Sequence, residues 1–221
     1  NNNSNFQVVD TQKKLGDIFV HQGKLIKGKI KTKDSVNLEI DSKRRANIRA
    51  YHSATHLLHE ALRRILGKHV IQKGSYVGPD KLRFDFSHMK PIEENEIKKI
   101  EKYVNDMIKG ESEVRTRLMT PKEAVDNGAL ALFGEKYGDE VRVLSMGKEK
   151  NKYFSTELCG GTHVNNTAEI GEFKIVNQSA IASGVRRVEA LRAEQLVNYL
   201  KKKKQDSDSL NKITSDKITV L

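Results

Sequence analysis

The sequence contains few cysteine, proline and aromatic residues. Its 221 residues include one cysteine, three prolines and no tryptophan, and aromatic residues make up 6%. A single cysteine excludes an intramolecular disulfide framework and is typical of a reducing compartment. No apolar run approaches the roughly 20 residues that a membrane-spanning helix needs, and no signal peptide opens the chain. We therefore expect a cytoplasmic protein with no membrane-spanning segment.

Positive charge, in contrast, is abundant and unevenly distributed. Forty lysine and arginine residues against 29 acidic residues give a net charge of +11. The net charge is +6 over residues 1–50, only +2 over 51–190 and +3 over 191–221. A surplus of this size suits a polyanionic partner, such as RNA, DNA or an anionic membrane surface, but does not distinguish among them.

The apolar pattern changes along the chain and predicts an α+β fold. Apolar residues at helical spacing predict a long helix over about 46–66, which Gly67 ends, and a second helix over about 93–109. Alternating apolar runs predict strands at 6–9, 18–21, 25–30 and 36–40, and again at 82–86, 141–146, 153–158, 172–178 and 185–190. A short helix is expected after Thr120, and a last helix from about 191.

These elements suggest three segments. Residues 1–45 are expected to form a partial small β-barrel. Residues 46–190 are expected to form a core in which a mixed or antiparallel sheet packs with the long helix. Residues 191–221 are expected to form a basic C-terminal helix and tail, since the run Lys201–Lys204 lies there.

Two pairs of potential metal ligands are each spaced by four residues. His52 and His56 lie on the predicted long helix, where this spacing puts both imidazoles on one face, about 5–6 Å apart at Cβ. Cys159 and His163 enclose two glycines, and a turn with positive φ there would aim both side chains at one point. The two pairs provide a Cys/His₃ donor set that suits zinc. The long helix is therefore expected to carry zinc.

Each half of this pattern also has an ordinary structural interpretation. A lone pair of histidines on a helix is weak evidence for a metal, and a lone cysteine is most often inert. His59 shares the helix face but lies two turns from His52, so the three histidines cannot easily meet at one tetrahedral ion. We therefore expect His59 to pack in the core or to form a hydrogen bond that supports a ligand. Ser53 stands where a thermolysin-type protease needs glutamate, and one cysteine excludes a classical zinc finger. A hydrolytic site or a structural clamp remains.

The motifs themselves resemble a known family. The segment 52–59 reads HSATHLLH and the segment 159–163 reads CGGTH, and both are similar to the zinc motifs of the alanyl-tRNA synthetase editing domain. The resemblance covers about residues 6–200 and includes QKGS at 72–75, LRFDFSH at 82–88, LFGEKYG at 132–138 and GVRRVEA at 184–190. The editing domain of threonyl-tRNA synthetase shares the HxxxH and CxxxH plan, but the complete motifs look like the alanyl type.

This resemblance implies a zinc-dependent aminoacyl-tRNA deacylase. The implied reaction hydrolyses the ester of serine or glycine wrongly attached to alanine-specific tRNA, with zinc at the positions of His52, His56, Cys159 and His163. Four protein ligands would leave no open position on zinc, whereas three ligands would leave one for water. Editing is needed because a pocket for alanine rejects similar amino acids by only ~1–3 kcal/mol. The family's glycine-rich motif, aminoacylation domain and C-terminal domain are missing from the sequence. We therefore expect an editing fragment with an incomplete first barrel.

Two more residues are candidates for the reaction itself. Thr55 lies between the helical ligands, where its hydroxyl can meet a serine side chain or the ribose; its ordinary role is a hydrogen bond to the preceding turn. Gln72 matches a family position linked to editing, and its amide can orient water or the ester carbonyl. The alternatives are a zinc-stabilised tRNA-binding module without activity and a threonyl-type editing domain.

Three basic residues are candidates for contacts with tRNA. Arg186 and Arg187 can contact phosphate, although one of the two is expected to be an ordinary solvated strand residue. Lys201 opens the lysine run, whose ordinary role is an exposed helix end. Arg83 and Asp85 are expected to pair with each other across the polar face of their strand.

Overall fold

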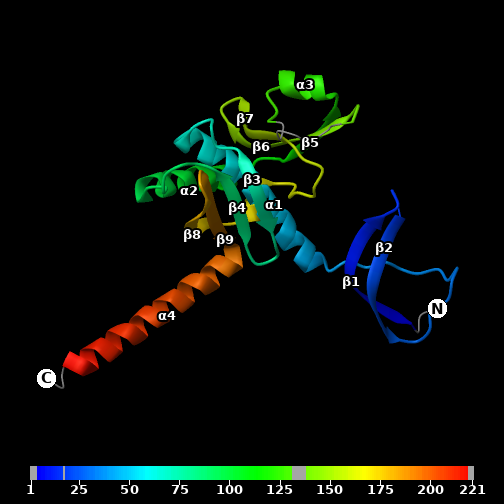
Figure 1. Cartoon of the computed structure of the whole chain (residues 1–221), viewed down its shortest axis with the longest axis horizontal. Coiled ribbons are helices and arrows are strands. Elements are labelled where there is room, and N and C mark those ends of the chain that lie inside the picture. The colour runs from blue at the N-terminus through cyan, green and yellow to red at the C-terminus, as the bar shows by residue number, and fades with distance from the viewer. Residues whose placement is uncertain (1–3, 17, 131–137, 219–221) are drawn as a thin grey trace. The chain divides into compact units, whose positions relative to one another are not determined.

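The chain forms two compact units in the computed structural model, residues Asn1–Asp41 and Ser42–Leu221 (Figure 1). The structure describes residues 4–16, 18–130 and 138–218, with side chains described as far as residue 209. In these ranges no helix combines the length and the apolar character needed to cross a membrane. The division of the chain into segments 1–45, 46–190 and 191–221 stays a prediction.

The described part of the N-terminal unit contains one antiparallel hairpin. Strand β1 (Asn5–Lys14) pairs with β2 (Ile18–Lys27) from end to end, and Leu15 and Gly16 take positive φ angles as the chain leaves β1. The strand predicted at 36–40 is wrong, and its three large apolar side chains are 61–68% exposed. Apolar alternation makes a strand only where a neighbouring strand accepts its hydrogen bonds. The predicted partial barrel is therefore not confirmed.

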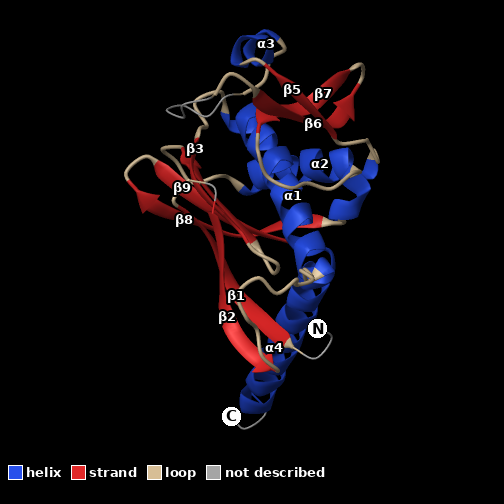
Figure 2. Ribbon diagram, turned by 90° about the vertical axis from the view of Figure 1, so that its right-hand side faces the viewer, coloured by secondary structure: helices blue, strands red, loops and turns tan. Residues whose placement is uncertain are grey.

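Helix α1 (Ser42–Leu66) runs through the larger unit and contacts both of its sheets (Figure 2). Every side chain from Ser53 to His59 is buried, as expected of a helix that is covered on several sides. The helix begins at Ser42 rather than at 46. It ends at Gly67 as predicted, where a φ of +120° lets the Gly67 N–H donate to the carbonyl of Arg63 at 3.0 Å.

The two sheets of this unit are antiparallel, which confirms the α+β class. The four-stranded sheet has the order β3-β4-β9-β8 and the three-stranded sheet the order β5-β6-β7. Their strands are β3 (Gln72–Val77), β4 (Leu82–Ser87), β5 (Arg115–Met119), β6 (Val141–Glu149), β7 (Lys152–Leu158), β8 (Phe173–Ala182) and β9 (Val185–Arg192). Five were predicted from their apolar patterns. The strands β3 and β5 were missed because they are short and carry few apolar residues.

The remaining helices follow their sequence signals. Helix α2 (Glu94–Lys109) closely matches its predicted range, and α3 (Pro121–Asp126) opens on a capping box between Thr120 and Glu123. Helix α4 (Ala193–Ile218) follows β9 directly. Leu196 in its first turn is buried, whereas the run Lys201–Lys204 is exposed.

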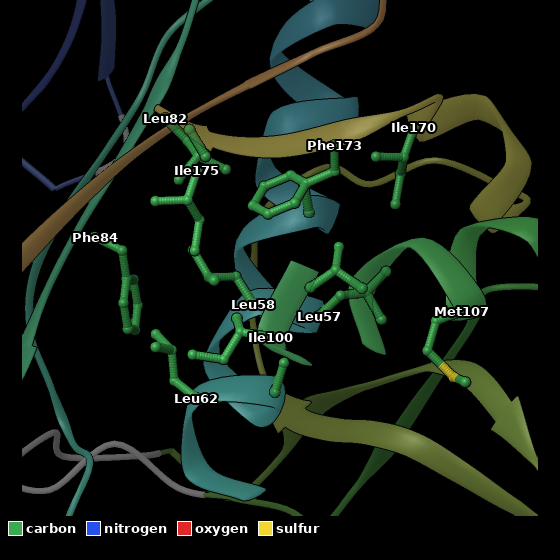
Figure 3. Close-up of a cluster of buried hydrophobic side chains, with 14 of the residues drawn as sticks. Leu57, Leu58, Leu62, Leu82, Phe84, Ile100, Met107, Ile170, Phe173 and Ile175 are labelled. Atoms are coloured by element: carbon green, nitrogen blue, oxygen red, sulfur yellow. The ribbon is translucent and has the colours of Figure 1, made fainter. Parts of the chain in front are cut away.

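The larger of two apolar clusters in this unit packs α1 against α2 and the four-stranded sheet (Figure 3). Leu57, Leu58 and Leu62 of α1 meet Ile100 of α2 and Phe84 of β4, and none of these side chains is exposed. Complete burial of such a side chain contributes about 1.5–3 kcal/mol. The core therefore fixes the helix that carries His52 and His56.

Candidate metal centre

The structure brings the four predicted ligands together. His52 and His56 project from α1, and Cys159 and His163 lie in the turn between β7 and the 3₁₀ helix η1 (Thr167–Ile170). One potential ligand atom from each residue lies within 4.8 Å of those of the other three. Segments about a hundred residues apart thus converge on one point, as the motif spacing predicted.

The donor atoms are those that a metal ion requires. The buried Nε2 atoms of His56 and His163 have no hydrogen-bond partner among the described residues, although an unpaired buried polar atom is costly. His52 Nε2 lies 3.6 Å from Cys159 Sγ. Three imidazole nitrogens and one thiolate form a donor set that zinc prefers. The residues present therefore fit a bound metal ion.

The protonation preferences of the turn residues also suit a metal. Burial raises the pKa of the Cys159 thiol, but the close imidazoles of His163, His52 and His56 outweigh this effect and lower the pKa to about 3. Burial lowers the pKa of His163 to about 4. Thiolate and neutral imidazole are the forms that bind metals. Both residues are thus poised as ligands.

Glu157 is a residue of this site that the sequence analysis missed. Its buried carboxylate lies between two histidines, with Oε2 2.6 Å from His56 Nδ1 and Oε1 3.0 Å from His59 Nδ1. Burial penalises both charges, but attraction between them raises the pKa of His56 and lowers that of Glu157. Glu157 lies near the end of β7, two residues before Cys159, and no local pattern in the sequence relates its carboxylate to His56. Of its two predicted roles, His59 shows packing, with its ring centroid 5.2 Å from that of Phe84, and its hydrogen bond goes to Glu157 rather than to a ligand.

Ser53 supports the other side of the site. Its buried hydroxyl donates to the carbonyl of Arg49 at 3.0 Å and accepts the Val164 N–H at 3.1 Å, which ties α1 to the turn. The same oxygen lies 3.5 Å from His163 Nδ1. Ser53 and Glu157 thus each face the Nδ1 atom of a ligand histidine whose Nε2 atom has no described partner. From the sequence alone, Ser53 only excludes a thermolysin-type protease, and its contacts with Val164 and His163 could not be seen.

The two glycines of the turn act differently from the prediction. Neither Gly160 nor Gly161 has a positive φ angle, so the expected left-handed turn is wrong. Gly161 is needed for space, because a Cβ there would lie 2.3 Å from Cε1 of His52, whereas a Cβ on Gly160 would meet open space. Arg142 Nη1 holds the turn by donating to the carbonyls of both glycines, at 3.2 and 2.8 Å.

The two candidates for the reaction itself lie on different elements. Thr55 is buried beside His56 on α1, and its hydroxyl donates to the carbonyl of Tyr51 at 2.9 Å, which is its ordinary structural role. Gln72 begins β3, and its side-chain amide lies 3.5 Å from Ser75 Oγ. Their part in a reaction stays a prediction.

The three basic candidates lie outside the cluster, on β9 and α4. Arg187 makes a bidentate pair with Asp85, with N–O distances of 2.7 and 2.8 Å, while Arg83 is 3.7 Å from the same carboxylate. Asp85 thus pairs mainly across strands rather than with Arg83 as expected. Arg186 Nη2 donates to Gln178 at 3.3 Å. Residues 132–137 of the LFGEKYG motif lie outside the described residues.

Comparisons with known proteins agree with these motifs. Residues 141–189 match the family described as "Threonyl and Alanyl tRNA synthetase second additional domain". The chain is 58% identical over 198 residues to the alanine–tRNA ligase of Parvibaculum lavamentivorans, covering 88% of this chain and 22% of that protein. It is 51% identical over 219 residues to the ligase of Bradyrhizobium diazoefficiens, covering 96% and 24%. The chain thus spans about a fifth to a quarter of the curated relatives it matches, and it belongs to the alanyl-tRNA synthetase family.

Proposed function

We propose that the chain hydrolyses the ester that joins serine or glycine wrongly to alanine-specific tRNA, and that zinc is its metal. The observation that carries this proposal is the Cys/His₃ cluster on α1 and the turn after β7, whose ligand atoms lie within 4.8 Å of one another. The relatives named alanine–tRNA ligase support tRNA as the partner. The name alanine–tRNA ligase describes the activity of the whole relative, so the editing reaction of this chain is our inference.

The residues of the cluster have separable tasks in this proposal. His52, His56, Cys159 and His163 would hold the zinc. When bound, zinc supplies a Lewis acid for a water molecule or for the ester carbonyl, which requires a coordination position that one of them can enter. The low pKa of the Cys159 thiol keeps this ligand in its thiolate form at neutral pH. The chain thus presents a prepared set of donors.

The substrate contacts that we propose lie beside the cluster and outside it. The Thr55 oxygen keeps lone pairs for a substrate N–H or O–H because its own hydrogen donates to the carbonyl of Tyr51. The partly exposed Gln72 would orient the ester or a water molecule. Arg186, Arg187 and Lys201 would contact tRNA phosphates, with Arg187 using the N–H groups that Asp85 leaves free.

A deacylation assay tests this function directly. The chain is incubated with serine-charged alanine-specific tRNA, with and without a chelator, beside its His56→Ala and Cys159→Ala variants. We expect release of serine that the chelator and both substitutions abolish. His21→Ala is the matched control, since His21 is an exposed histidine of the hairpin, and it should retain the wild-type rate.

Two alternatives give different results in the same assay. Zinc-loaded chain that binds the tRNA but leaves the ester intact would be a zinc-stabilised binding module, and the proposed reaction would be wrong. Release of serine from threonine-specific tRNA, and not from alanine-specific tRNA, would identify a threonyl-type editing domain.

A further inference from the structure

The contacts behind the ligand His56 go beyond the four ligands themselves. The Glu157 carboxylate lies between His56 and His59, and each of its oxygens faces one Nδ1 atom, at 2.6 and 3.0 Å. The side chain of Glu157 is 10% exposed and those of the two histidines 9% and 2%. Three polar side chains thus form a buried row that leads from the cluster into the interior.

The row determines which nitrogen of each histidine carries hydrogen. An ionised carboxylate only accepts hydrogen bonds, so both Nδ1 atoms that face it must donate. In a neutral imidazole, the other nitrogen then holds a lone pair. For His56 that nitrogen is Nε2, the buried atom without a described partner. The carboxylate thus selects the tautomer of His56 that can bind a metal.

The row also balances charge. A zinc ion with the Cys159 thiolate and three neutral imidazoles carries a net charge of +1, and an uncompensated buried charge is costly. Glu157 supplies one negative charge through its hydrogen bond to His56. His59, which shares the α1 face and packs against Phe84 with ring centroids 5.2 Å apart, holds the second carboxylate oxygen in place.

We propose that Glu157 is a positioning residue of the metal centre, which fixes the metal-binding tautomer of His56 and neutralises the site, and that His59 locks the carboxylate. This inference rests on the proposed metal site. Carboxylates that accept from the second nitrogen of a ligand histidine typically contribute 10–100-fold to metal affinity. Glu157 is therefore expected to act on metal binding before any effect on the reaction.

Glutamine cannot replace this carboxylate, although it has nearly the same shape. Its side chain has one accepting oxygen and one donating NH₂ group, so one of the two Nδ1–H groups would face another donor. Either His56 must take the tautomer whose Nε2–H cannot bind a metal, or His59 must place an N–H at its buried Nε2, which has no described partner. Both outcomes weaken metal binding, but neither leaves a cavity, because glutamine has nearly the same shape as glutamate.

Metal titration of the whole chain tests the proposal. Zinc affinity is measured by competition with a chromogenic chelator, and the ligand environment by the visible absorption of bound Co²⁺. We expect Glu157→Gln to bind zinc 10–100-fold more weakly and to change the Co²⁺ spectrum. The exposed Glu140→Gln is the matched control and should match wild type in both measurements.

A second pair of variants separates positioning from folding. His59→Leu removes the hydrogen bond to Glu157, whereas His59→Asn keeps an N–H donor near the position of Nδ1. We expect His59→Leu to weaken zinc binding and His59→Asn to restore most of the affinity. Thermal unfolding of the metal-free variants reports folding independently.

The outcomes are distinguishable. If wild type and Glu157→Gln bind zinc with equal affinity and give the same Co²⁺ spectrum, the proposed role of Glu157 is wrong. If Glu157→Gln loses only the thermal stability of the metal-free chain, Glu157 is merely structural and the proposal is again overturned. If wild type itself binds no zinc, the metal site of the proposed function fails as well.

Discussion

A Cβ atom on Gly161 would lie 2.3 Å from Cε1 and 2.8 Å from Nδ1 of His52. The Gly161→Ala change must therefore displace the His52 ring or the turn that carries Cys159 and His163. A displacement of about 1 Å at a reactive site costs on the order of 100-fold in rate. We expect Gly161→Ala to lose zinc affinity and deacylation together, as measured by metal titration and serine release.

Gly160 provides the control for this prediction. A Cβ there meets no heavy atom within 4 Å, and its φ angle is not in the left-handed region. Gly160→Ala should therefore keep the wild-type zinc affinity and rate. Equal loss in both variants would show that flexibility of the turn, rather than space beside His52, is the requirement.

Much of the fold and the ligand set could be predicted from the sequence because both rest on local spacing. The sequence alone shows the apolar period of α1 and the glycine at 67 that ends it. It also shows the four-residue spacing of His52 and His56. The sequence predicted that the two ligand pairs converge. In the structure the potential ligand atoms of His52, His56, Cys159 and His163 lie within 4.8 Å of one another. Zinc itself stays a proposal.

The supporting contacts could not be predicted because they depend on long-range packing. Glu157 reaches His56 across 101 residues of sequence, and Ser53 reaches Val164 across 111. No local pattern tells which buried polar residue will face a given imidazole. The same limit explains the wrong strand at 36–40, where the alternation is present but a partner strand is not.

Ser53→Ala is expected to weaken both the fold and the site. The change removes the acceptor of the Val164 N–H and of His163 Nδ1, and a buried donor left unpaired costs about 1–3 kcal/mol. Chemical denaturation of the metal-free chain should show a loss of this size. The exposed Ser207→Ala on α4 is the control, and equal stability of the two variants would contradict the tie between α1 and the turn.

Removal of metal is expected to lower the melting temperature of the larger unit. The ligands join α1 to the turn after β7, so zinc should bind the folded chain and not the unfolded one. Zinc at 100 times its Kd then contributes about 2.7 kcal/mol, which corresponds to a shift of about 5–10 °C for a unit of this size. Scanning fluorimetry with zinc and then with chelator measures it.

The double variant His56→Ala with Cys159→Ala tests the origin of that shift. Without these ligands, zinc and chelator should leave the melting temperature unchanged. A shift that persists in the double variant would place the metal elsewhere in the chain.

The Asp85–Arg187 pair should make stability depend on pH in the acid range. Hydrogen bonds from Arg187 hold the pKa of the Asp85 carboxyl below its ordinary value of 3.8, against the effect of burial. Because the folded pKa is lower than the unfolded pKa, the contribution is present above about pH 4 and is lost as the pH falls through the folded pKa. Asp85→Asn should therefore be less stable than wild type at pH 7, and the difference should shrink toward pH 2.

Denaturation with urea at several pH values measures this difference. The exposed Asp139→Asn serves as the control and should track wild type throughout. A difference between wild type and Asp85→Asn that grew as the pH fell would contradict the pairing.

The placement of positive charge predicts how tRNA binding responds to salt. The segments 1–50 and 191–221 carry nine of the eleven net charges, so the binding energy should come mainly from phosphate contacts and weaken steeply as salt rises. This salt dependence can be assigned to a single residue.

Lys201 is exposed on α4. Lys201→Gln should reduce the slope of log K against log salt by about 1 if its ammonium contacts a phosphate. The exposed Lys99→Gln on α2, in the near-neutral middle, should leave the slope unchanged. Equal slopes for wild type and Lys201→Gln would remove Lys201 from the interface, and binding insensitive to salt would exclude the proposed division between basic flanks and a near-neutral centre.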